Sequence, residues 1–341
     1  MTRELYTARL NIIQGIREFF SNREYLEVHT PLMAEYCIPE STIPLFHTRQ
    51  YHPWEDGTNL QLLPSPEYYM KQLLASGWGD MFQISGSFRN GETGGSIHLR
   101  EFTMLEYYAV HTDYMGSMGI TQDFIRYLLT LPGTAPPVRE RWKNIPFRRI
   151  SMQEAFLQHA AVDLEGILTP GSQPHPADRE ALFHICREKD LKPETTDSWE
   201  VLFNRIFLNL VEPELCRDPS PVFLYNYPAK LSSLSRLTAD GLWNERWELY
   251  WQGVELANCF SEENNQENIE AFFRNEIREI ELRNREAQQD GGDFNPPTRA
   301  DREFSRKIAG LPPCSGTAMG VDRLLMILLG KNSIRDVVPF S

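Results

Sequence analysis

Two arginines stand in sequence contexts that could bind a phosphorylated ligand. The first, Arg323, follows the small, glycine-rich stretch 314–320 and opens the apolar run 324–329, a pattern that predicts a strand, a tight turn and a helix. An arginine in the first turn of a buried helix is unfavourable against the helix dipole unless a negative group faces it. A nucleotide phosphate would serve. A protein carboxylate that pairs with Arg323 would serve equally, and for this stretch alone it is the simpler interpretation.

The second arginine, Arg89, ends the predicted strand 81–90, and 101–108 is the predicted antiparallel return of that strand. The glycine-rich loop between them would place Arg89 and Phe102 near the mouth of one hairpin. Arg89 offers a planar cation to a phosphate or carboxylate, and Phe102 offers a ring face to a base. An isolated hairpin of this kind is more often plain sheet, so its pairing with the Arg323 segment is the informative feature.

Carboxylates near these segments suggest metal and amine binding. Glu248 and Glu255 lie on two predicted strands joined by a turn at Gln252-Gly253, which can bring both side chains to one face. Two converging carboxylates suit Mg²⁺, although ion pairs with Arg or Lys would explain them as well.

A third carboxylate, Glu67, is expected in the first turn of a helix, with Ser65 as its cap and Pro66 at its first position. It would favour the helix dipole or hold a substrate amine.

The elements that position these residues alternate between helix and strand. Helical spacing of apolar residues predicts an amphipathic helix from residue 10 to residue 20, followed by a strand over 25–33 that Pro31 confines to an edge. Such an edge behind a long helix suits a dimer surface, and an ordinary helix–strand pair explains it equally well. Other predicted elements are helices over 177–189 and 198–215, a buried strand over 223–228 and a charged surface helix over 267–289.

Composition excludes several classes of function. The 341 residues carry a formal net charge of −13, so broad non-specific binding to nucleic acid or to an anionic membrane is disfavoured. The five cysteines show no metal-binding spacing, which fits reduced thiols in a cytoplasmic protein. We see no apolar signal core and no run long enough to span a bilayer.

Taken together, the arginine segments resemble class II aminoacyl-tRNA synthetases. Phe88-Arg89 with Glu101-Phe102 resembles their motif 2, 316–323 resembles motif 3, and 17–31 resembles motif 1. The stretches 65–67, 102–108 and 253–258 are similar to the lysyl branch. The similarity covers 16–340, and no anticodon-binding domain is expected before motif 1, a form that resembles the elongation factor P lysine ligases. The resemblance implies an α+β fold, with a mixed, mostly antiparallel sheet flanked by helices. It also implies a single catalytic domain over 1–341 with a helical insertion at about 150–215.

That resemblance implies ATP-dependent activation of (R)-β-lysine or lysine and transfer to a lysine side chain of elongation factor P. It also implies Mg²⁺, a homodimer, no stable tRNA binding and no membrane partner. The implied catalytic residues are Arg89 and Arg323. The implied ATP-binding residues are Arg89, Asn90, Glu92, His98, Phe102, Glu248, Gly320 and Arg323. The implied substrate-binding residues are Ser65, Glu67, Glu106, Tyr108, Glu255, Asn258, Glu262 and Ala318, and the implied metal ligands are Glu248 and Glu255.

Departures from the family pattern refine these expectations. Ser65 and Ala318 stand where lysyl-tRNA synthetases typically carry Ala and Gly, and both changes would favour a β-amine on steric grounds. Gly91 and the pair Leu99-Arg100 depart from the usual motif 2 loop. They keep two alternatives open, namely a non-catalytic paralogue that senses an amino acid or binds a partner, and a ligase that joins an amino acid to a small amine.

One basic cluster stands out in the acidic chain. A run of this kind is usually a solvated face, but it could also meet an acidic partner such as elongation factor P. Its members are Arg139, Arg141, Lys143, Arg148 and Arg149.

Overall fold

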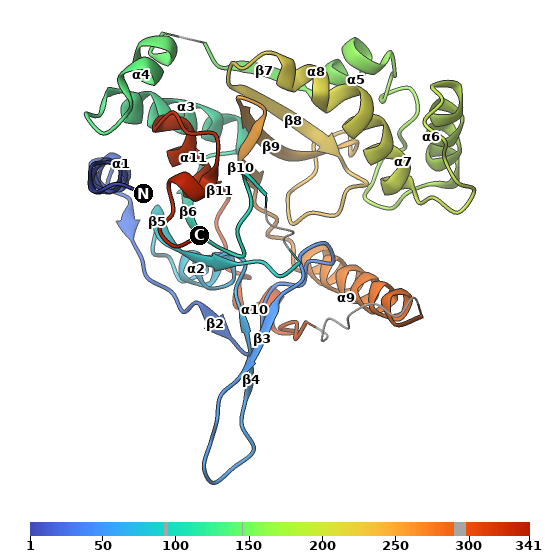
Figure 1. The fold of residues 1–341 in the computed structure, drawn as a ribbon. Helices are drawn as coiled ribbons and strands as arrows, with labels where there is room; N and C mark the ends of the chain where they lie inside the picture. The colour runs from blue at the N-terminus through green and yellow to red at the C-terminus, as the bar shows by residue number, and fades with distance from the viewer. Residues whose placement is uncertain (92–94, 145, 290–297) are drawn as a thin grey trace.

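An eight-stranded mixed sheet forms the centre of the protein (Figure 1). The computed structural model describes residues 1–91, 95–144, 146–289 and 298–341. Only the pairs β1–β5 and β7–β8 are parallel, so the sheet is mostly antiparallel and the predicted α+β class is confirmed. In spatial order the strands are β1 (Leu26–Glu27), β5 (Met81–Phe88), β6 (Glu101–Val110), β11 (Cys314–Gly320), β10 (Val254–Ser261), β9 (Trp243–Trp251), β8 (Val222–Pro228) and β7 (Arg148–Ser151).

The two faces of this sheet differ because successive residues of a strand point to opposite sides. In β6, Leu105 and Tyr107 are fully buried in the main apolar core, whereas Glu106 and Tyr108 belong to the other face. The helices of the core are α1 (Arg3–Ser21), α3 (Tyr114–Thr130), α4 (Pro136–Trp142) and α11 (Val321–Leu328), which lie together beside the central strands (Figure 1). The face opposite this core carries the Glu106 carboxylate next to a second apolar cluster, which includes Tyr108 and Met81.

The segment after α1 differs from its prediction as one strand over 25–33. Residues 26–27 form the edge strand β1, whereas β2 (Met33–Ala34) joins a separate three-stranded sheet with β3 (Phe46–Arg49) and β4 (Asn59–Leu62). Pro31 has no N–H to continue the ladder, and the Thr30 N–H donates to the Gln83 side chain (3.0 Å) in place of a strand partner.

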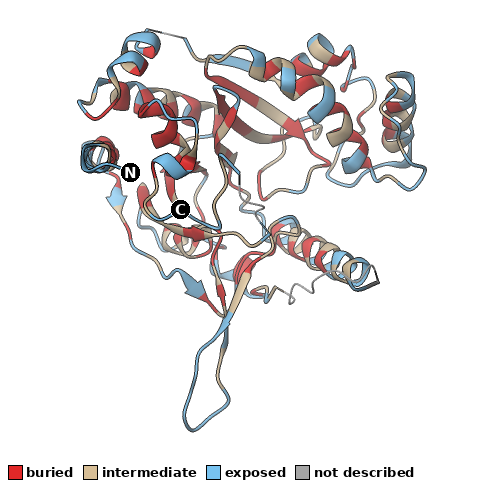
Figure 2. Ribbon diagram, viewed as in Figure 1, coloured by how far each residue is buried: buried red, intermediate tan, exposed pale blue. Residues whose placement is uncertain are grey.

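The small sheet extends into a long hairpin that projects from the body (Figure 1) and is exposed at its tip (Figure 2). Beyond it, α2 (Glu67–Ala75) has Pro66 as its N-cap and no side-chain cap hydrogen bond. The predicted capping role of Ser65 is therefore wrong, because the helix begins one residue later than the pattern indicated. Glu67 still occupies the first turn, as predicted.

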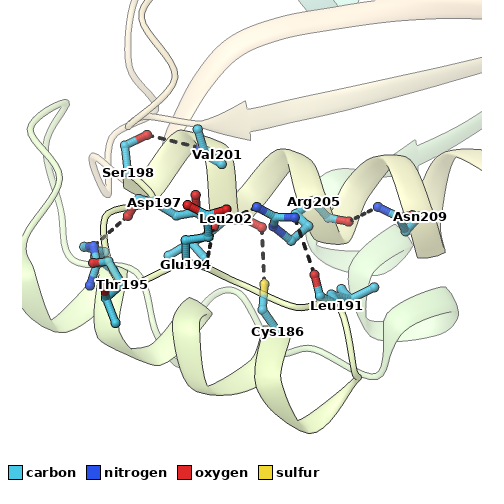
Figure 3. Close-up of polar contacts among 11 residues, drawn as sticks. Cys186, Leu191, Glu194, Thr195, Asp197, Ser198, Val201, Leu202, Arg205 and Asn209 are labelled. Atoms are coloured by element: carbon cyan, nitrogen blue, oxygen red, sulfur yellow. Dashed lines mark hydrogen bonds and ion pairs between the residues drawn. The ribbon is translucent and has the colours of Figure 1, made fainter.

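The helical insertion packs around β7 and β8 with an apolar core of its own. It contains α5 (Met152–Ala160), α6 (Pro176–Glu188), α7 (Trp199–Ile206), the π-helical turn η1 (Phe207–Val211) and α8 (Glu212–Arg217). The predicted single helix over 198–215 is therefore interrupted by a π-helical turn. The turn before α7 is fixed by polar contacts (Figure 3): the Ser198 hydroxyl caps Val201 N–H, and Arg205 pairs with Asp197 at 2.7 Å.

The remaining helices complete the described chain. They are α9 (Gln266–Gln289), which confirms the predicted surface helix, α10 (Phe304–Lys307) and the 3₁₀ turn η2 (Ile334–Asp336). Within the described residues, none of the helices is both long enough and apolar enough to cross a membrane.

Candidate active site

The site is built on the sheet face opposite the helical core. Register places Gly316 of β11 opposite Tyr108, and Ala318 opposite both Glu106 of β6 and Asn258 of β10. Residues that pair across neighbouring strands share a face. The residues that share a face with Glu106 and Tyr108 of β6 therefore include Gly316 and Ala318 of β11 and Asn258 of β10. The predicted pocket residues of these three strands lie together.

The predicted hairpin of β5 and β6 is confirmed, with Ser87 paired to Phe102. The guanidinium carbon of Arg89 lies 5.4 Å from the centre of the Phe102 ring. Arg89 Nε is buried and has no hydrogen-bond partner among the described residues. A buried donor without a partner is costly, and an anionic ligand oxygen at this point would satisfy it. The pair Arg89 and Phe102 thus suits a phosphate or carboxylate beside a base.

Three further residues near Arg89 were predicted to bind ATP: Asn90, Glu92 and His98. The Asn90 N–H donates to Pro44 O (3.0 Å), and its side-chain amide donates to Leu45 O (3.5 Å), so Asn90 anchors the chain segment before β3. Glu92 lies outside the described residues. His98 is half-buried and follows Ile97, the residue whose carbonyl contacts the second arginine.

Arg323 lies in the first turn of α11, which follows β11 directly, in agreement with the predicted strand and helix. Its Nε donates to Ile97 O (3.1 Å) and its Nη1 donates to Glu255 O (2.8 Å). Nη1 is also 4.0 Å from Glu255 Oε2, so a protein carboxylate, one of the two negative partners considered for this arginine, lies nearby. A Cβ on Gly320 would make only ordinary contacts with Arg323, so packing within the protein does not require glycine there.

Glu248 and Glu255 are the predicted metal ligands on β9 and β10. The two strands join at a turn, and the register shifts beside Glu255, which resets the alternation as expected. Although the Glu255 side chain is 43% exposed, desolvation of its carboxylate and the charge of Glu248 raise its pKa to about 7. Arg323 and Arg246 partly offset that rise.

These two carboxylates suit Mg²⁺ better than an ion with an all-protein shell. No group of three or more His, Cys, Asp or Glu that could hold a metal occurs in the part of the chain that the structure describes. Mg²⁺ commonly uses one or two carboxylates together with phosphates and water. Glu248 also accepts hydrogen bonds from Arg246 (2.6 Å) and Tyr250 (2.8 Å), which fix its orientation.

The predicted amine pocket contains a lysine of the protein itself. Lys71 Nζ lies 2.5 Å from Glu67 Oε1 and 2.7 Å from Glu262 Oε2, and its side chain is 1% exposed. Nearby, the Tyr108 hydroxyl donates to Glu106 Oε1 (2.6 Å), while Glu106 Oε2 is buried without a hydrogen-bond partner among the described residues. Two carboxylates therefore contact the Lys71 ammonium, and the carboxylate of Glu106 interacts with it electrostatically. The pocket holds more acidic groups than cationic ones, so it could accept cationic groups of a ligand.

Burial and the charges of neighbouring carboxylates raise the pKa of two residues in this pocket, Glu262 and Glu106. Burial raises the pKa of Glu262 to about 7, with Lys71 opposing the rise and Glu67 adding to it. Burial and then the charge of Glu67 raise the pKa of Glu106 well above its usual value. Burial alone would lower the pKa of Lys71, but the facing carboxylates of Glu262 and Glu67 raise it. An ammonium group that entered the pocket would favour the ionised forms of Glu262 and Glu106.

Two small residues of β11 make space for this cluster. A Cβ on Gly316 would lie 2.1 Å from Glu262 Oε1 and 2.5 Å from a ring carbon of Tyr108, so only glycine fits there. The amine pocket thus depends on backbone as well as on side chains. Ala318 borders Glu106 and Asn258, and the Asn258 side chain accepts a hydrogen bond from Arg246 Nε (3.0 Å).

Lys71, Arg246 and Glu40 lie beside predicted site residues but were not themselves predicted. Lys71 is one helical turn after Glu67, and Arg246 is two residues before Glu248 on the same strand face, so spacing was an available signal for both. Glu40 lies in an irregular segment with no periodicity. Only the folded chain reveals that it lines a small cavity with Ser65 and Glu67.

Comparison with known proteins agrees with this geometry. The family model of the class II tRNA synthetases (D, K and N) matches residues 1–341, and the chain belongs to that family. This family in general uses ATP and a divalent metal. The chain is 36% identical over 338 residues to the elongation factor P–(R)-β-lysine ligase of Salmonella typhi, covering 98% of this chain and 93% of the relative. Identity to the ligase of the same name from Salmonella paratyphi B is 35%, with the same coverage.

Proposed function

We propose that this protein activates (R)-β-lysine or lysine with ATP and transfers it to a lysine side chain of elongation factor P. One observation carries the proposal: strand β6 carries Phe102 beside Arg89 and, on the same face, Glu106, and a cluster of Glu67 and Glu262 around Lys71 lies by that strand. An amino acid with two ammonium groups complements this arrangement, with its carboxylate toward Arg89. The names of the relatives support the same substrate and acceptor.

In the activation step, a substrate carboxylate oxygen attacks the α-phosphorus of ATP and pyrophosphate leaves. Arg89 would neutralise the α-phosphate and orient the carboxylate, and Phe102 would stack on the adenine. Arg323 would cover the adenine and bind the γ-phosphate. Glu248 and Glu255 would hold Mg²⁺, which offsets charge on the departing pyrophosphate. Positioning and charge are sufficient for this chemistry, so no side-chain nucleophile is required.

In the transfer step, the amine of the acceptor lysine attacks the carbonyl carbon of the adenylate and AMP leaves. Glu67 would bind the amine nearest the carboxylate, while Glu262 and Tyr108 would bind the far ammonium beside Glu106. Ser65, Ala318 and Asn258 would line the intervening part of the pocket. Ser65 and Ala318 are larger than the residues typical of lysyl-tRNA synthetases, which supports a preference for an amine one carbon farther from the carboxylate.

ATP–pyrophosphate exchange with (R)-β-lysine, with L-lysine and with no amino acid tests this activity. We expect exchange that depends on either lysine and is lost in Arg89→Ala, with Arg302→Ala, an exposed arginine far along the chain, as a control. Near-normal exchange in Arg89→Ala would remove Arg89 from the site. An amino acid that binds without exchange would favour the non-catalytic alternative. Exchange followed by transfer only to small amines would favour the alternative of a ligase that joins an amino acid to a small amine.

We also propose a homodimer formed through the N-terminal region. The predicted helix–strand unit over 10–33 has several large exposed apolar side chains, and exposed apolar surface is typical of interfaces. They are Leu10, Leu26, Leu32 and Met33. A monomeric mass in solution at micromolar concentration would contradict this proposal.

We propose that elongation factor P docks at the basic cluster, but through fewer of its residues than the sequence indicated. Lys143 pairs with Glu140 (2.6 Å) and Arg148 pairs with Asp218 (3.4 Å), so part of the positive charge is already balanced. Arg139 donates to backbone carbonyls and has a structural role. Arg141 and Arg149 are exposed and remain the best candidates for contact with an acidic partner.

The five cysteines are all free thiols. This supports a reducing compartment, and we propose a cytoplasmic location.

A further inference from the structure

The carboxylate of Glu40 stands at the junction of the two halves of the site, on the segment between β2 and β3. This segment has no regular structure, yet it is fixed by α9: the Ser41 N–H donates to Glu276 Oε2 (2.6 Å), and Arg283 donates to Ser41 O (3.1 Å). Glu276 is itself buried and accepts a second hydrogen bond from the Ser232 hydroxyl (2.6 Å). Glu40, the residue before Ser41, is therefore held in a defined position.

The far end of the same segment is attached to the nucleotide half of the site. The Asn90 N–H, directly after Arg89, donates to Pro44 O (3.0 Å). On its other side, Glu40 lines a small cavity together with Ser65 and Glu67 at the start of α2. The backbone contacts thus place one carboxylate between the strand end that carries Arg89 and the helix that carries Glu67.

The charges around Glu40 agree with this position. Burial raises the pKa of Glu40 to about 7, the charge of Glu67 adds to the rise, and Arg89 opposes it. Glu276 adds to the rise more weakly, and Lys71 opposes it. Glu40 therefore interacts both with the arginine that would hold the substrate carboxylate and with the carboxylate that would hold the nearest amine.

Glu67 alone is a weak binding site for an ammonium group because Lys71 already lies 2.5 Å from its Oε1. A substrate amine next to Glu67 would meet a carboxylate whose charge is largely balanced. An ammonium group has three donors and is bound well only when several acceptors face it. A second carboxylate on the same cavity would supply the missing negative charge.

We propose that Glu40 is a specificity-determining residue that binds, together with Glu67, the substrate ammonium nearest the carboxylate. This inference rests on the proposed function and adds a residue that the family resemblance did not indicate. It requires that Glu40 affect ligands that carry this amine and leave ligands without it unaffected.

The test is calorimetric binding of (R)-β-lysine, L-lysine and ε-aminocaproate, which lacks the amine near the carboxylate, to the parent protein and to Glu40→Gln. We expect affinity for both lysines to fall about tenfold, the order of one charge-assisted hydrogen bond, with little change for ε-aminocaproate. Glu55→Gln, which removes an exposed carboxylate near the tip of the β3–β4 hairpin, should bind all three ligands as the parent does. Glu40→Asp should retain part of the lysine affinity, and thermal unfolding would establish that each variant is folded.

The possible outcomes separate this inference from the proposed function. Unchanged lysine affinity in a folded Glu40→Gln, or an equal loss for ε-aminocaproate, would overturn the role of Glu40 alone. Failure of both lysines to bind the parent protein would overturn the proposed function and this inference together. If Glu40→Gln does not fold, lysine binding by Glu40→Asp at the parent affinity would overturn the proposal.

Discussion

Arg9 and Asp322 form a buried ion pair, with Nη1 2.6 Å from Oδ1, although one lies in the first helix and the other in the last. The second oxygen of Asp322 accepts from Thr103 N–H (2.6 Å), and Arg9 Nη2 donates to the Thr103 hydroxyl (3.2 Å). Thr103 follows Phe102, and Asp322 precedes Arg323. This network therefore fixes both proposed nucleotide-binding elements against α1.

Breaking this network should cost both stability and activity. We expect Asp322→Asn to lower the free energy of unfolding by about 3–5 kcal/mol, because it leaves the buried Arg9 without its charge partner. Urea unfolding would measure the loss, and ATP–pyrophosphate exchange should slow in the folded fraction. The control is Arg17→Ala on the same helix, whose ion pair with Glu27 is 37% and 24% exposed. Loss of such a pair costs only about 0–1 kcal/mol. Equal losses in the two variants would contradict a positioning role for Asp322.

Gly316→Ala should abolish lysine binding with a smaller effect on ATP binding. The added methyl group would lie 2.1 Å from Glu262 Oε1 and 2.5 Å from Tyr108, so the amine pocket must rearrange. The matched control is Gly119→Ala in α3, where a Cβ meets nothing within 4 Å and helix propensity favours alanine. Calorimetric titration with lysine and with ATP would separate the two effects. Normal lysine affinity in Gly316→Ala would show that this pocket is not the amine site.

Much of the fold follows from local patterns in the chain. The two apolar stretches 81–90 and 101–108, joined by a glycine-rich loop, predict the hairpin of β5 and β6, and the glycine-rich stretch before Arg323 predicts a strand, a turn and a helix. The pairing of Lys71 with Glu262 could not be predicted, because it depends on where α2 lies relative to the residue that follows β10. The position of Glu40 was missed for a similar reason. Its segment has no periodicity, and contacts from α9 and from Asn90 determine where it lies.

Substrate binding should release protons near neutral pH. The raised pKa of Glu262, about 7 in the free protein, means that it binds more protons folded than unfolded between about pH 4.5 and 7. Its contribution to stability is therefore present at low pH and is lost as pH rises through about 7. A bound ammonium reverses the preference, so lysine affinity should increase as pH rises through about 7. Lys71 and Glu67 act directly on Glu262 in this titration, and Glu106, Tyr108 and Cys314 also interact with it.

Calorimetry in two buffers of different ionisation enthalpy would measure the protons released. Glu262→Gln should reduce the release and flatten the dependence of affinity on pH. If the parent protein binds lysine equally well across the range from about pH 6 to 8, the carboxylates of the pocket titrate at ordinary values and this part of the account is wrong.

Removal of either proposed metal ligand should weaken the dependence of exchange on Mg²⁺. In Glu248→Gln and Glu255→Gln we expect exchange to slow by about 10²–10³-fold, the order seen when one group that stabilises transition-state charge is removed. Exchange measured across a range of Mg²⁺ concentrations would separate metal binding from misfolding. Glu245→Gln, on the same strand as Glu248 and paired with Arg236 at 2.9 Å, is the control. Parent-like behaviour of both ligand variants at limiting Mg²⁺ would refute the metal assignment.

The central claim is that the acceptor is elongation factor P and not tRNA, and the net charge of −13 supports it. Binding of tRNA relies on many contacts between cationic side chains and phosphates, which this surface charge opposes. A folded acceptor that presents one lysine needs only a small docking surface. Protein loaded with the radiolabelled β-lysyl adenylate should therefore be mixed with elongation factor P and, separately, with lysine tRNA, and the label followed. We predict label on elongation factor P and none on tRNA. Label on tRNA with none on elongation factor P, or label on neither acceptor, would contradict the account.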